Sequence, residues 1–214
     1  MAPQPQVRTI GRADAAAPPL VLASASPSRR RLLAEAGVAL QWDEARVDES
    51  EVKDALKAEG AEPEQVAETL SELKAQRVSR RHPGALVIGA DQMMECGGIW
   101  FDKPSDLDHA AAHLRALSGR AHRLLTSVCV VRDGQRLWHH NDQARLTMRS
   151  LSERFVADYL EAVGEAALGS VGAYQLEGLG AQLFSRVEGD YFTILGLPLL
   201  PLLDFLRHHR AVPT

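Results

Sequence analysis

The chain has 214 residues, 45% hydrophobic and 24% charged, with a net charge of -4 and a pI near 6.1. This length supports one sizeable core or two closely joined lobes. The acidic balance argues against a protein that binds nucleic acid through a broad basic surface. Only Cys96 and Cys129 occur, so we expect neither a disulfide framework nor a zinc cluster, and a cytoplasmic location. The longest apolar stretch, 192–205, is broken by glycine, prolines and an aspartate, and it is too short to span a bilayer.

Residues 1–19 are rich in alanine and proline and lack a sustained hydrophobic period, which predicts a mobile tail. The folded domain is expected from residue 20 to about residue 210. It opens with an apolar strand, Leu20 to Ser24, that feeds a helix from Pro27 to about Ala36 with Ser26 as its N-cap. Free N–H groups at such a helix start attract anions, and nearby serines and arginines add donors. This stretch predicts a phosphate site.

The next elements lead to an aspartate. Residues 40–47 look like a strand that ends in an acidic run, and Pro63 to Arg81 predicts a long helix with Lys74 at the edge of its apolar face. The continuous apolar run 85–90 predicts a strand buried on both faces and ending at Asp91. Residues 93–101 then predict a hairpin that turns at Gly97-Gly98.

The second half of the chain mixes helices with strands. Asp133-Gly134 predicts a tight turn between two long strands. The remaining expected elements are helices at 106–117, 153–163 and 198–208 and short strands at 182–184 and 191–195. The fold class expected from this pattern is α/β with a mixed sheet and flanking helices.

Several polar residues are candidates for catalysis or ligand binding, and each also has a purely structural interpretation. Asp91 at a strand end can bind Mg²⁺ or orient a water, or it can simply cap a turn. Lys74 and Lys103 can neutralise phosphate, or they can be solvated surface lysines. Glu49 can support a metal, or it can be a solvated acid. The loop 174–180 can let the backbone approach a base or ribose through its glycines, or it can be an ordinary turn.

Together these pieces resemble the Maf family of nucleoside triphosphate pyrophosphatases, which is associated with septum formation. The resemblance covers about residues 20–206. Its motifs are LASASPSRRRLL, LKA in the long helix, GADQ, FDKP, GAYQLEGLGAQLF and GDYFTILGLPLLPLL. It implies a fold related to the inosine-triphosphate pyrophosphatases, with two lobes around a cleft. It also implies cleavage between the α and β phosphates, with a divalent metal, Mg²⁺ or Mn²⁺.

The resemblance also implies roles for individual residues. Asp91 matches the proposed catalytic base, and Ser24, Arg29, Lys74 and Lys103 match phosphate-side residues. The chemistry is consistent, because a triphosphate carries about four negative charges and needs several cations and a metal to offset repulsion of a nucleophile. Asp91 and Glu49 are the candidate metal ligands.

Three positions bear on the base. Where the branch that resembles dTTP/UTP pyrophosphatases has Arg, Thr and Gln, this chain has Ser28, Gln92 and Glu177. The branch that resembles 7-methyl-GTP pyrophosphatases has Trp, Gln and Glu, so the chain matches it at two of three positions. A carboxylate at Glu177 can accept from N1–H and the 2-amino group of guanine. Ser28 has no indole to stack on a cationic methylated base.

The first hypothesis is therefore a metal-dependent pyrophosphatase acting on a non-standard or modified nucleoside triphosphate, with 7-methyl-GTP as a candidate. The alternatives are a dTTP/UTP pyrophosphatase and a non-catalytic nucleotide-binding regulator of cell division. Neither a nucleic acid nor a membrane is expected as a partner. A homodimer is what the family resemblance suggests.

Overall fold

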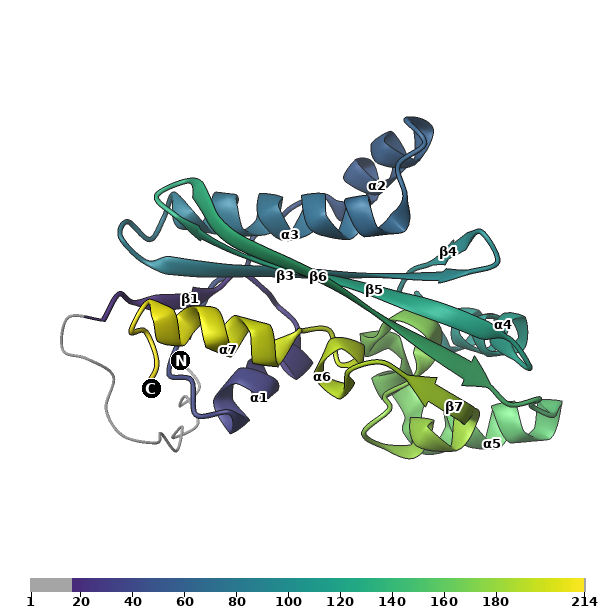
Figure 1. The fold of residues 1–214 in the computed structure, drawn as a ribbon. Helices are drawn as coiled ribbons and strands as arrows, with labels where there is room; N and C mark the ends of the chain where they lie inside the picture. Colours follow the sequence, from purple (N-terminus) through teal and green to yellow (C-terminus); the bar gives the residue numbers. More distant parts are fainter. Residues whose placement is uncertain (1–16, 214) are drawn as a thin grey trace. The chain divides into compact units, whose positions relative to one another are not determined.

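The computed structural model describes residues 17–213, and it forms the mixed α/β fold that the sequence predicts (Figure 1). The predicted tail, residues 1–19, lies outside the described residues except for 17–19. The helices and strands are β1 (Leu20–Leu22), α1 (Pro27–Glu35), β2 (Gln41–Trp42), α2 (Glu49–Ala58), α3 (Pro63–Ser79), β3 (Leu86–Cys96), β4 (Ile99–Phe101), α4 (Leu107–Leu117), β5 (Ala121–Arg132), β6 (Gln135–Met148), α5 (Glu153–Val163), β7 (Phe184–Glu188), α6 (Tyr191–Ile194) and α7 (Leu199–His208). Three 3₁₀ segments, 164–169, 171–173 and 179–183, lie between α5 and β7.

The strands hydrogen-bond in the order β2-β1-β3-β5-β6-β7, and β4 pairs with β3. The chain divides into two compact units. The first unit takes the described residues up to Asp91, Thr126–Asn141 and those from Gly196 onward. The second unit takes Gln92–Leu125 and Asp142–Leu195. No helix within residues 17–213 is both long and apolar enough to cross a membrane.

In the first unit, β1 pairs in parallel with β2 and β3, and Val21 lies opposite Val87. Helix α3 covers one face of these strands, and α1 and α7 lie on the other (Figure 1). The core under α3 is built mainly of small and β-branched side chains: Val21, Ala23, Ala45, Ala75, Val78, Ala85, Val87, Cys129 and Val131. Such side chains let a helix approach a sheet closely.

In the second unit, β4 pairs antiparallel with the end of β3, with Met94 opposite Phe101. Strand β7 pairs antiparallel with β6, with Leu146 opposite Val187. Helix α4 packs against α5 and the first two 3₁₀ segments. Leucines, methionines and aromatic rings fill the core, among them Leu114, Leu146 and Tyr174.

Several sequence predictions differ from the structure in detail. The strand expected at 40–47 is only Gln41–Trp42, and a positive φ of 50° at Arg46 interrupts the extended backbone. The acidic run begins helix α2, because the Asp48 side chain accepts from Glu51 N at 3.2 Å as an N-cap. Residues 191–194 form helix α6, because Asp190 caps Thr193 N at 2.9 Å. A 3₁₀ segment takes 179–183, so β7 starts only at Phe184.

Candidate functional site

The first unit brings five of the predicted site residues into one polar cluster. Asp91 lies within β3, which continues to Cys96, so the prediction that the strand ends at Asp91 is wrong. Successive side chains of a strand point to opposite faces, so positions 87, 89 and 91 share one face, the face that α3 covers. The carboxylate of Asp91 therefore points toward α3 rather than capping a turn.

Lys74 joins this carboxylate to a second one. Its Nζ donates to Asp91 Oδ1 at 2.5 Å and lies 2.7 Å from Glu49 Oε1. The side chains of Lys74 and Asp91 are only 10% and 5% exposed, so the solvated-lysine interpretation is wrong for Lys74. Its position on α3 belongs to the buried stripe Ser71, Lys74, Ala75 and Val78, not to the stripe's edge.

Glu49 opens helix α2, and its side chain is 44% exposed. Burial acts to raise the pKa of its carboxyl, but the ammonium of Lys74, with smaller contributions from Lys53 and Arg29, outweighs burial and leaves the pKa below its usual value. Glu49 is therefore held as a carboxylate beside Lys74.

Arg29 is the second cation, in the first turn of α1 and only 9% exposed. Its Nε donates to the Gly196 carbonyl at 2.7 Å, and its Nη1 donates to the Ala90 carbonyl at 2.9 Å and to Ser24 Oγ at 3.3 Å. Burial lowers the pKa of the guanidinium, and the nearby charges of Asp91 and Glu49 oppose that effect. These acceptors hold Arg29 in one orientation beside the residue that precedes Asp91.

The start of α1 has the local structure that the sequence predicts. Ser26 is the N-cap, and its Oγ accepts from Arg29 N at 3.5 Å. Ser24 Oγ also accepts from Ser26 N at 3.2 Å, which fixes the turn between β1 and the helix. Ser28 is half-buried one residue before Arg29. The backbone and hydroxyl donors needed for an anion are therefore present here.

Two carboxylates in this cluster fit a divalent metal. Asp91 Oδ2 is buried and has no hydrogen-bond partner among the described residues, so this oxygen remains available as a ligand. Glu49 supplies the second carboxylate. No group of three His, Cys, Asp or Glu side chains within residues 17–213 can hold a metal alone. Mg²⁺ is commonly bound by one or two carboxylates together with substrate phosphates and water, so this donor set is sufficient.

Three predicted residues lie in the second unit. Gln92 follows Asp91, and its Nε2 donates to the Thr193 carbonyl at 3.0 Å, which fixes the side-chain amide against α6. Lys103 is exposed after β4. Glu177 is half-buried in the glycine loop. A Cβ at Gly180 would lie 2.4 Å from Gln175 O, so this loop requires glycine there.

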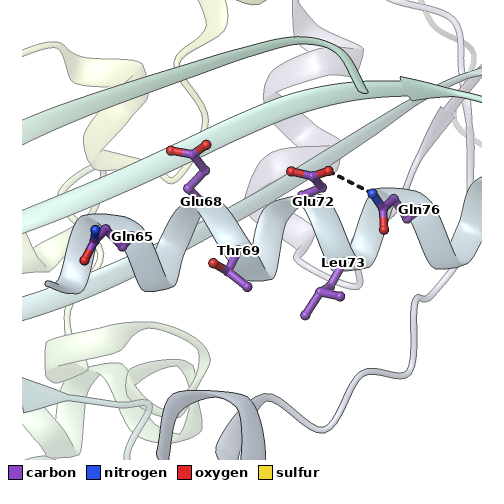
Figure 2. Close-up of a pocket in the computed structure, with 6 residues that line it drawn as sticks. All are labelled: Gln65, Glu68, Thr69, Glu72, Leu73 and Gln76. Atoms are coloured by element: carbon purple, nitrogen blue, oxygen red, sulfur yellow. Dashed lines mark hydrogen bonds between the residues drawn. The ribbon is translucent and has the colours of Figure 1, made fainter. Parts of the chain in front are cut away.

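A hollow on α3 has the wrong charge for a triphosphate (Figure 2). It measures about 460 Å³, and two of its six lining residues are Glu68 and Glu72. Both carboxylates accept from Arg136 on β6 at 2.8 Å. Figure 2 also shows Glu72 accepting from Gln76 Nε2, at 2.8 Å. With carboxylates and no cation in its lining, this hollow disfavours a polyanion.

The backbone partners of Arg29 are not indicated by the sequence. The carbonyls of Gly196 and Ala90 hold Arg29, yet a carbonyl leaves no signal in the choice of residue. Gly196 has a φ of 94°, which favours glycine, so the glycine itself is the trace that this position leaves in the sequence.

Comparison with known proteins agrees with the resemblance found in the sequence. The model of the family described as Maf-like protein matches residues 19–209. A protein of Paramagnetospirillum magneticum named nucleoside triphosphate pyrophosphatase is 60% identical over 88% of this chain and 97% of its own length. A protein of Granulibacter bethesdensis with the same name is 54% identical over 90% and 98%. A protein of Rhizobium johnstonii named 7-methyl-GTP pyrophosphatase is 54% identical over 91% and 98%.

Proposed function

Because the chain belongs to the Maf-like protein family, we propose that it is a nucleoside triphosphate pyrophosphatase. It hydrolyses a nucleoside triphosphate to a nucleoside monophosphate and pyrophosphate. The observation that carries the proposal is the buried pair of Lys74 and Asp91, in which Asp91 keeps one buried oxygen without a hydrogen-bond partner among the described residues. A purely structural ion pair would be expected to satisfy both oxygens.

Asp91 acts as the general base. Water attacks the α phosphorus, its proton passes to the Asp91 carboxylate, and the bond from the α phosphorus to the bridging oxygen breaks. Pyrophosphate leaves with that bridging oxygen. Arg29 and Lys74 offset the negative charge that accumulates, and Arg29 does so from an orientation fixed before substrate arrives. Ser24 and Lys103 are each assigned to binding phosphate oxygens.

A divalent metal, Mg²⁺ or Mn²⁺, would be held by Asp91 and Glu49. When bound, it supplies charge neutralisation of the phosphates. The ammonium of Lys74 keeps both carboxylates close together.

The base is recognised by Glu177, Gln92 and Ser28. We assign a guanine-type base, with 7-methyl-GTP as a candidate, because a carboxylate can accept from two neighbouring N–H groups of guanine but from only one in uracil or thymine. Relatives of this chain, among them the Rhizobium johnstonii protein, are named 7-methyl-GTP pyrophosphatase, which supports this assignment. The proposed setting is the cytoplasm, with the protein as a homodimer.

The test is a panel of ordinary and methylated nucleoside triphosphates, assayed for pyrophosphate with Mg²⁺, with Mn²⁺ and with a chelator. We expect pyrophosphate and a nucleoside monophosphate in equal amounts, with guanine-type substrates preferred. Preference for dTTP and UTP would overturn the assignment of the base. Tight nucleotide binding without turnover of any substrate would contradict the enzymatic function and favour a non-catalytic regulator of cell division.

A further inference from the structure

Glycine is required at position 89 on β3 because a side chain has no room there, not because the backbone conformation favours glycine. Its φ is outside the left-handed region, so any residue could adopt this backbone. A Cβ at this position, however, would lie 2.1 Å from the Ser71 carbonyl oxygen and 2.8 Å from Ala75 Cβ. Both atoms belong to α3. A glycine inside a strand can mark the place where another backbone approaches closely, and here that backbone is α3.

This contact lies next to the proposed catalytic pair. Ala75 follows Lys74 on α3, and Gly89 precedes Asp91 by two residues on the same face of β3. The distance between α3 and β3 at Gly89 therefore sets how far the ammonium of Lys74 lies from the carboxylate of Asp91.

A residue of β5 contacts α3 at the same position. Ser127 Oγ lies 3.1 Å from Ser71 Oγ, and both side chains are buried. Cys129, also on β5, lies in the same core cluster as Ala75. Polar contacts inside an otherwise apolar core specify one arrangement, because sliding or lifting α3 would leave these groups without partners.

We propose that Gly89 is a positioning residue for the pyrophosphatase reaction: by admitting α3 against β3, it places Lys74 within hydrogen-bond distance of Asp91. The proposal rests on the proposed function only for the consequence in catalysis. A side chain at this position displaces α3, and Lys74 moves away from Asp91 with it.

The main test variant is Gly89→Ala. We expect the distance between Lys74 Nζ and Asp91 Oδ1 in its crystal structure to exceed hydrogen-bond length. We expect kcat to fall about 100-fold, because a displacement near 1 Å can cost that much, whereas KM changes far less. Ala75→Ser presses on the same contact from the helix side with one added atom, and it carries the test if Gly89→Ala does not fold.

Ala67→Val is the matched control, since Ala67 is a buried alanine of the same helix two turns before Ala75. Its kcat should stay near that of the wild type even if its unfolding midpoint falls. An unchanged Lys74–Asp91 distance in Gly89→Ala would overturn the proposal, as would wild-type kcat with a lengthened distance. If the wild-type protein releases no pyrophosphate, the proposed function fails, and the crystallographic distance still decides whether Gly89 positions Lys74.

Discussion

Lys74 and Asp91 form a buried ion pair, with Nζ 2.5 Å from Oδ1, and the same ammonium lies 2.7 Å from Glu49. One cation thus holds two carboxylates, only one of which is fully buried. Because desolvating charges is costly, such a pair is weak evidence for stability alone and stronger evidence for a site. Its position in the GADQ stretch connects it with the motif that the family resemblance depends on.

Asp91→Asn should reduce kcat for pyrophosphate release by about 10²- to 10⁴-fold, because an amide cannot accept the proton of the attacking water. The fold should be retained, since the side chain keeps its shape; circular dichroism checks this. Asp54→Asn, at an exposed position on α2, is the control and should remain active. Wild-type turnover by Asp91→Asn would show that another group is the base.

Lys74→Met should lower both activity and the free energy of unfolding. Removing one partner of a buried ion pair costs about 3–5 kcal/mol, because Asp91 is left as an uncompensated charge. Urea denaturation measures the loss, and Arg77→Met, at an exposed position on the same helix, should change stability little.

A double variant separates stability from chemistry. Lys74→Met combined with Asp91→Leu replaces the whole pair with apolar side chains, and it should recover most of the lost stability while remaining inactive. Recovery of activity in this variant would contradict the role assigned to both residues.

Local sequence signals were sufficient for much of the fold. The Ser26 cap, the glycine turn at 97–98 and the Asp133-Gly134 turn are found where the sequence predicts them. The cap and the two turns each depend on a few adjacent residues, so the local sequence is sufficient to predict them. Helices α2 and α6 were missed because each depends on an aspartate cap beside residues of mixed propensity. At such positions, a side-chain hydrogen bond to a backbone N–H helps to determine whether a helix begins.

The candidate site was harder to predict from the sequence alone than the fold was. Residue type suggested Asp91, Lys74 and Arg29, but burial of Lys74 follows from the packing of α3 on β3, which no local pattern contains. The pairing of Lys74 with Glu49 requires α2, an element the sequence did not predict. Lys103 and Glu177 remain predictions that rest on the family resemblance.

Glu177→Gln should change substrate preference and leave the chemistry intact. An amide offers guanine one acceptor in place of a carboxylate, and it can also donate to a uracil carbonyl. We expect the ratio of kcat/KM for the guanine-type substrate to that for UTP to fall about tenfold, the value of one hydrogen bond to a charged group. Glu165→Gln, an exposed acid of the same unit, should leave the ratio unchanged. An unchanged ratio in Glu177→Gln would remove Glu177 from base recognition.

His122 should make the protein sensitive to mild acid. It is 1% exposed, its Nε2 lies 2.8 Å from Tyr174 Oη, and its Nδ1 has no partner among the described residues. Burial lowers the pKa of His122 from 6.5 to about 4. Between these pH values the unfolded chain binds a proton at His122 and the folded protein does not. The contribution of His122 to the free energy of unfolding is therefore fully present above pH 6.5 and is lost as the pH falls toward 4.

The expected loss across this pH range is about 3 kcal/mol in the free energy of unfolding, at 1.36 kcal/mol per pH unit. Urea denaturation at several pH values between 7.5 and 4.5 measures it. His122→Phe should be less stable than the wild type at pH 7.5, because Tyr174 loses its partner, but its stability should depend less on pH in this range. His208→Gln, at an exposed position on α7, should keep the wild-type pH dependence. The same slope in His122→Phe as in the wild type would assign the acid sensitivity to another group.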